Sequence, residues 1–296
     1  MLSTHLIDKT EIYFHKRASH GANIYGKKGE YDGKYFSYDG NSMYCYILSK
    51  KSIKIPIKGG KAYKLKKIDT EKTGIYKIKI TSIVDPVKFK SLGDDYFYYT
   101  NWDIKALDML KYNYELDNND INAFVYEDDD CLSGKYLFND YVKKLFDIKT
   151  NVCKDIKTVM SMLWGEPSSM KKDKINFCDM NKYNPKDFQS FDQSKGVVYL
   201  KDHHQPFNWT FARLTPFMLS SARYLISQIA VDVIDAGYDI IRIHTDSILT
   251  NCPPDVFTEI YEINPKKLGA MKIETDKCFD GKFTIEHVNS IFGKIN

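Results

Sequence analysis

The sequence predicts an α/β protein of the α+β type, in which an antiparallel sheet carries the functional groups and helices pack against it. Three observations indicate this class. Residues 240–250 hold two short β-branched, apolar runs on either side of a polar quartet, which is the pattern of a tight β-hairpin. An aromatic, strand-like run at 35–38 ends in a turn. A long helical pattern begins near Thr215 and leads directly into the hairpin.

The composition argues against several classes of protein. The chain has 296 residues and a formal net charge of +4, so any nucleic-acid-binding face must be local. The six cysteines include no C-x-x-C pair, which argues against a disulfide framework or a zinc site and favours a cytoplasmic, intracellular protein. The sequence shows no signal peptide and no run of about 20 apolar residues, so we expect no membrane partner.

The first chemically informative segment is 35–44. Its aromatic run ends at Asp39, and the turn at 40–42 leads to Tyr44, so the carboxylate is predicted at the end of a strand. A single Asp at a turn more often serves the turn than catalysis. The interest of Asp39 therefore depends on a partner elsewhere in the chain.

Segment 50–67 contains eight lysines and no acidic residue, with isoleucines at Ile53, Ile55 and Ile57. This alternation predicts a strand with one basic face. Such a face either neutralises nucleic-acid phosphates or is an ordinary solvated surface, and the sequence leaves both interpretations open. A second alternating strand is predicted at 75–80.

A helix is predicted to begin near Thr100. Thr100 or Asn101 can cap it, and Asp103 in its first turn favours the helix dipole. Four adjacent carboxylates follow at 127–130 and end at a Ser-Gly pair. We expect an exposed loop at that run instead of a metal site.

Helical patterns then cover 136–148 and 156–164. Lys157 lies at the start of the second helix, and Lys149 lies at the end of the first. A helical lysine that projects from such a pair can reach triphosphate oxygens, where its charge stabilises the transition state of phosphoryl transfer.

Residues 166–205 are polar and lack sustained periodicity, so we interpret them as an insertion. His203 and His204 with Cys178 do not have the spacing of metal ligands, and we expect the two histidines to be loop residues. The long helix that follows should be capped by Thr215 and stopped by Gly237. Its predicted buried stripe is Phe217, Ala222, Leu225, Ile226, Ile229 and Val233.

Asp39 and Asp246 together predict a metal site, because each is presented at a strand end or hairpin tip. Two such carboxylates can share a pair of Mg²⁺ ions, which prefer oxygen ligands and retain several waters or phosphate oxygens. A pair of metal ions activates the attacking oxygen and stabilises the leaving oxygen during nucleotidyl transfer.

These segments resemble motifs of family B DNA polymerases. Residues 39–44 are similar to motif A (D-x-x-S-L-Y), and 244–247 are similar to motif C (D-T-D-S). Residues 157–165 resemble motif B (K-x-x-x-N-S-x-Y-G), and 264–269 resemble a D-P-K-K-L-G stretch that follows motif C. The likeness is strongest to the protein-primed branch found in bacteriophages, adenoviruses and linear plasmids.

The resemblance implies roles for individual residues. Asp39 and Asp246 would be catalytic and would bind Mg²⁺ or Mn²⁺, with Gly40 as a further ligand. Tyr44 would pack under the sugar and exclude a ribose 2′-OH. The residues expected at the nucleotide are Tyr44, Lys157, Ser161 and Trp164. Those expected at DNA are Lys149, Arg223, Thr245 and Ser247. Arg223 could equally pair with a structural carboxylate.

The resemblance also divides the chain. Residues 1–135 would be the N-terminal half of a polymerase palm with motif A and a basic, β-rich insertion, and 136–165 the fingers helices with motif B. Residues 166–205 would be an insertion, which in the resembled branch wraps DNA and confers processivity. Residues 206–296 would be the C-terminal half of the palm with motif C. No exonuclease domain and at most a rudimentary thumb are expected.

Three positions depart from the family pattern. His244 replaces the first Asp of D-T-D-S, and Ser161 with Met162 replaces the Asn-Ser pair of motif B. The K-x-Y motif that the family carries after motif C has no clear counterpart near 286–291.

The function that these features favour is DNA-directed DNA synthesis, in which dNMP is added to a primer 3′-OH by two-metal catalysis. Its partners would be primer-template DNA and dNTPs, with a terminal protein primer or a separate exonuclease or thumb chain as further candidates. One alternative is a polymerase-like subunit or fragment that is inactive without partner chains. A second is a non-catalytic DNA-binding replication module. A third is an α/β protein whose Asp turns are coincidental.

Overall fold

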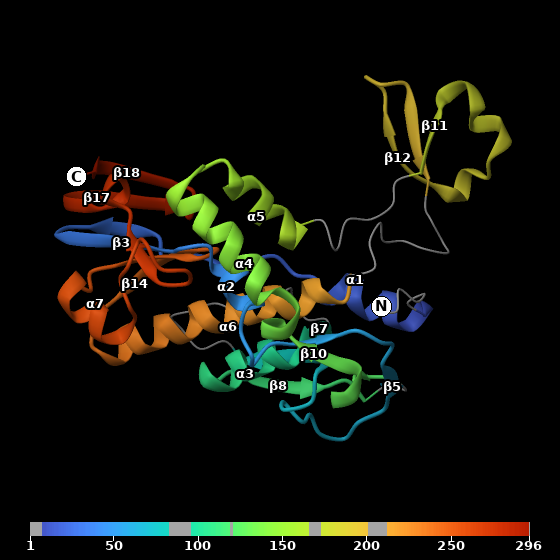
Figure 1. Ribbon diagram of the computed structural model, residues 1–296, viewed down its shortest axis with the longest axis horizontal. Coiled ribbons are helices and arrows are strands. Elements are labelled where there is room, and N and C mark those ends of the chain that lie inside the picture. The colour runs from blue at the N-terminus through green and yellow to red at the C-terminus, as the bar shows by residue number, and fades with distance from the viewer. Residues whose placement is uncertain (1–7, 83–95, 119–120, 166–172, 201–211, 296) are drawn as a thin grey trace.

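The computed structural model describes residues 8–82, 96–118, 121–165, 173–200 and 212–295 (Figure 1). Within these ranges, two larger antiparallel sheets and a central helix form the main body, and a small three-stranded unit projects from it. The predicted class, with antiparallel sheets and packed helices, is therefore confirmed.

The larger sheet has eight strands drawn from both ends of the chain. They are β1 (Ile24–Gly26), β2 (Gly29–Tyr31), β3 (Lys34–Gly40), β14 (Ile240–His244), β15 (Ser247–Thr250), β16 (Met271–Ile273), β17 (Phe279–His287) and β18 (Ser290–Ile295). Six of them follow the order β1-β14-β15-β3-β17-β18, while β16 pairs with β3 and β2 pairs with β17. The strands predicted at 35–38, in the hairpin and at 271–295 are therefore present.

The register of this sheet places β3 between two strands from the far end of the sequence. Asp39 of β3 lies opposite Ser247 of β15 on one side and opposite Lys272 of β16 on the other. Antiparallel pairing fixes which side chains become neighbours across the strands. Segments more than 200 residues apart thus meet at the end of β3.

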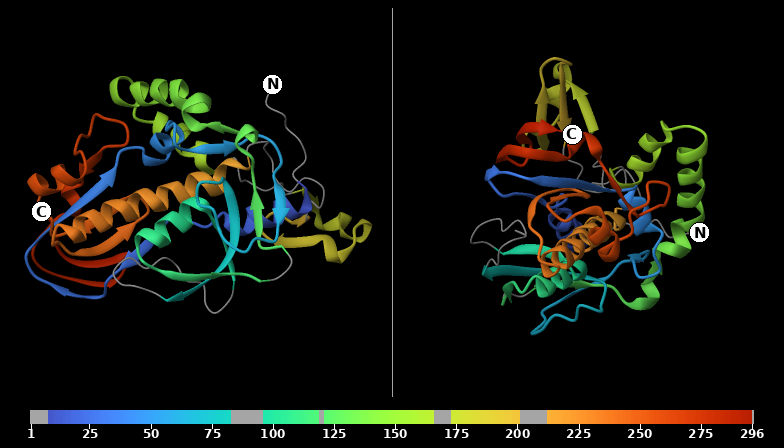
Figure 2. Two further views of the ribbon diagram at one scale, coloured as in Figure 1. Left: turned by 90° about the horizontal axis from the view of Figure 1, so that it is seen from below. Right: turned by 90° about the vertical axis from the view of Figure 1, so that its left-hand side faces the viewer.

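Helix α6 (Leu214–Asp235) runs through the middle of the main body (Figure 2). The six residues of its predicted apolar stripe are all buried, and Gly237, with φ of +88°, follows its C-terminal end as expected. The helix begins two residues earlier than predicted, and Arg213, not Thr215, is its N-cap residue. The prediction of Thr215 as the cap was wrong because the helical turn already includes Leu214.

By length and hydropathy, α6 meets the criteria for a membrane span, a run that the sequence analysis did not recognise. However, 72% of its most apolar window is buried inside the protein. Buried groups of α6 pack with Tyr38, Ile243 and Ile248 of the large sheet in one apolar cluster. Burial against the sheet therefore accounts for the apolar composition of this helix.

The second sheet comes from the segment between the first Asp turn and the paired helices. Its strands are β5 (Lys61–Tyr63), β6 (Gly74–Ser82), β7 (Phe97–Thr100), β8 (Asn113–Leu116) and β9 (Ala123–Val125). Helix α3 (Asn101–Met109) follows β7 and packs on α6. The predicted cap is confirmed, because Thr100 and Asp103 form a reciprocal capping box. Helix α1 (Lys9–Ala18) packs on β7.

The basic segment 50–67 differs from the prediction of one basic-faced strand. It forms two three-residue strands in different sheets, β4 (Lys54–Pro56), which pairs with β10 (Cys131–Ser133), and β5. A glycine pair separates them, and a Cβ on Gly60 would come within 2.5 Å of the Val125 carbonyl oxygen, so only glycine fits there.

Glu127, Asp128 and Asp129 are exposed, as predicted, but residues Asp128–Asp130 form a short 3-10 helix instead of a loop, and Asp130 is partly buried. The acidic run pairs with the basic segment. Lys54 contacts Asp128 at 2.6 Å, and Lys58 contacts Asp130 at 3.1 Å. The basic segment 50–67 and the acidic run 127–130 are far apart in the sequence, but they lie close together in the structure and partly neutralise each other's charge. Because Lys54 and Lys58 already have carboxylate partners, these two lysines do not support the interpretation of the basic segment as a phosphate-binding face.

Helices α4 (Gly134–Asn151) and α5 (Ile156–Gly165) form the predicted helical pair, and both pack on α2 (Met43–Leu48). Buried side chains from all three helices join in one cluster: Cys45, Val142, Leu145, Phe146 and Met160. This cluster holds the helical pair against α2, which begins just after the strand end that carries Asp39. Helix α7 (Pro254–Ile260) lies after the hairpin.

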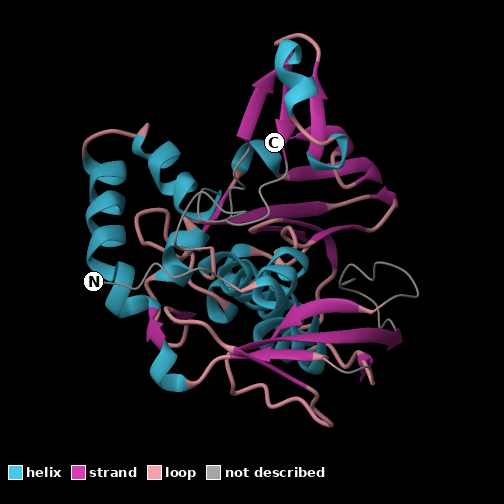
Figure 3. Cartoon of the chain, turned by 90° about the vertical axis from the view of Figure 1, so that its right-hand side faces the viewer, coloured by secondary structure: helices cyan, strands magenta, loops and turns pink. Residues whose placement is uncertain are grey.

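The projecting unit is formed by described residues of the segment 166–205. It contains the antiparallel strands β11 (Asp173–Asn176), β12 (Phe188–Asp192) and β13 (Val197–Leu200), which Figure 3 shows grouped apart from the main body. The sequence shows no sustained periodicity here because the strands are at most five residues long. His203 and His204 lie outside the described residues.

Candidate active site

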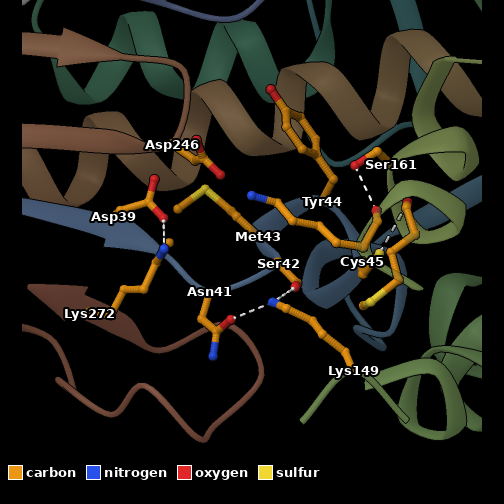
Figure 4. Close-up of a pocket in the computed structure, with 13 residues that line it drawn as sticks. Asp39, Asn41, Ser42, Met43, Tyr44, Cys45, Lys149, Ser161, Asp246 and Lys272 are labelled. Atoms are coloured by element: carbon orange, nitrogen blue, oxygen red, sulfur yellow. Dashed lines mark hydrogen bonds and ion pairs between the residues drawn. The ribbon is translucent and has the colours of Figure 1, made fainter. Parts of the chain in front are cut away.

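A pocket of about 240 Å³ opens where the end of β3, the β14–β15 hairpin, β16 and helices α2, α4 and α5 meet (Figure 4). Its walls combine two carboxylates with three lysines. The carboxylates are Asp39 and Asp246, and the lysines are Lys149, Lys157 and Lys272. Side chains from five separate segments of the sequence therefore share one cavity.

The two carboxylates are held by adjoining backbone. Asp39 lies near the end of β3, and Asp246 lies in the two-residue turn between β14 and β15, as the sequence predicted. The Gly40 amide donates a hydrogen bond to the Asp246 carbonyl oxygen at 2.8 Å, which joins the hairpin turn to the end of β3. A Cβ on Gly40 would approach Met43 Cε to 2.6 Å, so this close packing favours glycine.

The carboxylates also interact electrostatically. Burial raises the pKa of Asp246 above its ordinary value, and the charge of Asp39 raises it further. A hydrogen bond from the Thr245 hydroxyl at 2.9 Å acts in the opposite direction. Two neighbouring carboxylates of this kind favour a cation between them, because a cation relieves their mutual repulsion.

Lys272 projects from β16 toward Asp39, and its Nζ lies 2.9 Å from Asp39 Oδ2 (Figure 4). Burial lowers the pKa of Lys272, but the hydrogen bond to Asp39 and the negative charges of Asp39, Glu274 and Asp246 together outweigh burial and leave the pKa raised. Lys272 is therefore an ammonium at neutral pH. This residue could not be identified from the sequence, because its place beside Asp39 depends on the pairing of two distant strands.

Lys149, near the C-terminal end of α4, points at the turn after Asp39. Its Nζ donates to Asn41 Oδ1 at 2.9 Å and to Ser42 Oγ at 2.8 Å (Figure 4). Burial lowers the pKa of Lys149, and the charges of Lys272 and Lys157 lower it further. Lys149 thus belongs to the pocket, where α4 contacts the turn that follows Asp39.

The segment 264–269, which resembles the stretch after motif C, contacts the same turn from the other side. Asn41 Nδ2 donates to the carbonyl oxygens of Pro265 at 2.7 Å and Lys267 at 3.2 Å. The Gly269 amide donates to the Asn41 carbonyl oxygen at 2.9 Å. Asn41 is therefore a second residue that sequence reasoning did not assign, and it links Lys149 to this segment.

The residues predicted at the nucleotide lie partly in the pocket. Lys157 and Ser161 of α5 line it, and both are exposed. The Ser161 hydroxyl donates to the Lys157 carbonyl oxygen at 2.9 Å. Tyr44 also lines the pocket, and its pKa is raised to about 12 by burial and by the charge of Asp246. The side chain of Trp164 lies outside the described part of the structure.

The residues predicted at DNA fall in different places. Lys149 lies in the pocket, whereas the Thr245 and Ser247 hydroxyls both donate to the His244 carbonyl oxygen, at 2.7 and 3.1 Å. Thr245 has φ of +59°, a strained value for a β-branched residue. These two hydroxyls therefore shape the turn that presents Asp246.

Arg223 occupies the alternative position that the sequence left open. It is buried and forms an ion pair with Asp103, with Nε 2.8 Å from Oδ1. It also donates to the carbonyl oxygens of His20 and Gly21. Four of the five N–H groups of a guanidinium are engaged in this way. The arginine thus has a structural carboxylate as its partner.

The donor set of the pocket suits Mg²⁺. Within the described ranges, no group of three or more His, Cys, Asp or Glu side chains could enclose a metal ion. Mg²⁺ does not need such a cage, because it is commonly bound by one or two carboxylates and completes its shell with water and substrate phosphates. Asp39 and Asp246 supply two carboxylates, and the lysines opposite them suit a phosphate-bearing ligand.

No protein-family model and no curated protein matches the chain. Solved structures of similar fold do exist. Phi29 DNA polymerase complexed with primer-template DNA and incoming nucleotides matches 94% of this chain, with a TM-score of 0.63 and 17% sequence identity. The complex of that polymerase with primer-template DNA alone matches 94%, with a TM-score of 0.64 and 17% identity.

A third structure, phi29 DNA polymerase with single-stranded DNA, matches 98% of this chain with a TM-score of 0.62 and 17% identity. The chain spans about half the length of these polymerase chains, between 50% and 53%. At this identity the likeness shows the fold. The chain therefore has the fold of part of a DNA polymerase.

Proposed function

We propose that this chain is the palm and fingers part of a protein-primed, family B-like DNA polymerase. It adds dNMP to a primer 3′-OH under the direction of a template. The observation that carries the proposal is the pocket that two carboxylates and three lysines line together: Asp39, Asp246, Lys149, Lys157 and Lys272. Carboxylates for metal ions and lysines for phosphates are the two groups that nucleotidyl transfer requires in one cavity.

Each residue has a role in this proposal. Asp39 and Asp246 would hold Mg²⁺ or Mn²⁺, with Gly40 beside them. Ions bound there would supply activation of the primer oxygen and stabilisation of the pyrophosphate that leaves. Lys157 binds the triphosphate as an exposed point charge on α5. Tyr44 supports the sugar from the wall of the pocket.

Lys149 has a second role beyond its charge. Its bonds to Asn41 and Ser42 keep the turn between Asp39 and Tyr44 in one conformation. Ser42 has φ of 56° in this turn, so the backbone there needs support from its neighbours. Lys149 therefore positions the residues on which both the metal ions and the sugar depend.

The proposed partners follow from the reaction. Primer-template DNA and dNTPs are the substrates, and the enzyme acts at an intracellular site of viral or plasmid replication. A terminal protein can serve as the primer, and separate chains can supply an exonuclease or a thumb. The insertion that contains β11–β13 is a candidate contact for DNA.

The test is primer extension with templates that differ in their first unpaired base. The purified chain, Mg²⁺ and one dNTP at a time should yield addition of the complementary nucleotide alone. Asp39→Ala should abolish addition. Asp255→Ala, which removes an exposed carboxylate of α7, should not. Addition that ignores the template base would contradict a template-directed enzyme.

A second candidate is a polymerase-like subunit that needs partner chains. The chain spans about half the length of the polymerase chains that it matches. In the same assay, this candidate predicts binding of primer-template without extension. Binding that does not depend on metal ions would point instead to a non-catalytic DNA-binding module.

A further inference from the structure

The ammonium of Lys272 is paired with Asp39, one of the two candidate metal ligands. Its Nζ lies 2.9 Å from Asp39 Oδ2, and the two residues are directly opposed in the pairing of β16 with β3. The side chains of Lys272 and Asp39 are 36% and 21% exposed, so water screens the pair only in part. The pairing of β16 with β3 thus places the Lys272 ammonium beside the carboxylates of the pocket.

The other pocket lysines are placed differently. Lys149 donates to the neutral oxygens of Asn41 and Ser42, and Lys157 is exposed on α5. Among these three lysines, Lys272 is the one that forms an ion pair with a candidate metal ligand. A divalent cation that approaches the same oxygen of Asp39 must meet the charge of this ammonium. The two cations repel each other at such short range.

A nucleoside triphosphate changes this balance. Its phosphates carry negative charge into the pocket together with the metal ion. The flexible four-carbon stem of a lysine lets its ammonium move between partners without movement of the backbone. Phosphate oxygens therefore offer Lys272 a new anionic partner at the moment when the metal ion needs Asp39.

We propose that Lys272 is a positioning residue. Its ammonium stays paired with the Asp39 carboxylate until a metal–nucleotide complex enters the pocket, and then moves to pair with the phosphates. Lys272 thereby couples metal binding to nucleotide binding. A metal ion alone binds weakly because it must displace the ammonium, and a nucleotide raises metal affinity. This inference rests on the proposed function, since it takes the ligand to be a metal–dNTP complex.

The experiment measures Mn²⁺ binding from the electron paramagnetic resonance signal of the free ion. It compares the unmodified chain with Lys272→Met, with and without an α,β-imido dNTP that cannot be transferred. Lys272→Met should bind Mn²⁺ alone about tenfold more tightly and should lose most of the gain that the nucleotide brings, a size typical of coupling between two sites. Lys272→Arg, which keeps the charge, should behave as the unmodified chain.

Lys54→Met is the matched control, because it removes a lysine that is also paired with an aspartate but lies outside the pocket. It should change neither affinity. Unchanged or weaker binding of Mn²⁺ alone by Lys272→Met would overturn the inference, as would equal effects of Lys54→Met. These readouts do not use primer extension. A chain that shows the coupling but extends no primer would therefore refute the proposed function separately.

Discussion

Arg223 and Asp103 form a two-point ion pair inside the protein, with Nε to Oδ1 at 2.8 Å and Nη2 to Oδ2 at 3.0 Å. Their side chains are 4% and 0% exposed. Because Arg223 also binds the carbonyl oxygens of His20 and Gly21, the pair ties α3, α6 and the segment after α1 together. Helix α6 in turn contacts both strands of the hairpin that carries Asp246.

Arg223→Met should therefore lower the free energy of unfolding by about 3–5 kcal/mol, because it leaves a buried carboxylate without its partner. Chemical denaturation measures this change. The double variant with Asp103→Asn should cost clearly less than the two single variants together, since the residues act as a pair. Strictly additive costs would contradict the paired role.

Tyr44 should control which sugar the pocket accepts. Tyr44→Ala removes a ring from the pocket wall, and should raise incorporation of ribonucleotides relative to deoxyribonucleotides on the order of 10-fold or more. The ratio of kcat/KM for the two nucleotides measures the effect. Tyr136→Ala is a suitable control because Tyr136 is 78% exposed on α4. An unchanged ratio in Tyr44→Ala would argue against contact with the sugar.

Lys149→Met should reduce kcat/KM for dNTP by about tenfold, which corresponds to about 1.4 kcal/mol of transition-state stabilisation. The physical reason is the loss of its bonds to Asn41 and Ser42 and of one positive charge in the pocket. Lys144→Met removes an exposed lysine from the same helix and should have no effect. Equal losses in the two variants would indicate that the net positive charge of the protein matters, and not the contacts that Lys149 makes in the pocket.

His15 should make folding stability depend on pH. Burial, and then the charge of Arg213, lower its pKa from 6.5 to about 3. Between these values the unfolded chain binds a proton that the folded chain does not, so stability is complete above pH 6.5 and is lost as pH falls. The loss should reach about 2 kcal/mol at about pH 5.

Urea denaturation at several pH values between about 5 and 7 measures this dependence. His15→Gln removes the titrating group, so its stability should change less over the same interval. The hydrogen bond from His15 to Tyr126 is also altered, which lowers stability at every pH and leaves the slope as the informative quantity. Equal slopes in the two proteins would contradict the assignment to His15.

Much of the fold could be predicted from local patterns. The hairpin around Asp246, the cap at Thr100, the helical pair and the apolar stripe of α6 all depend on residues close together in sequence. The short strands β4 and β5 could not be predicted, because a glycine pair and two different sheet partners interrupt the alternation of the lysines. Their assignment depends on contacts with 123–133.

The site divides in the same way. Asp39 and Asp246 could be identified because each lies in a recognisable turn after a strand. Lys272 and Asn41 could not, because their positions depend on the register of β16 with β3 and on the fold of 264–270. The buried partner of Arg223 was likewise an open alternative, since sequence alone does not show that Asp103 faces α6.

The most direct test of the proposed function is the single-turnover rate of primer extension in Mg²⁺ for the unmodified chain and for Asp246→Asn. The variant keeps the size of the side chain and removes the charge that would hold the metal ion. We predict a fall in rate on the order of 1,000-fold or more, because metal ions supply several kcal/mol of transition-state stabilisation. A rate within about tenfold of the unmodified chain, with an unchanged melting temperature, would contradict two-metal catalysis at this pocket.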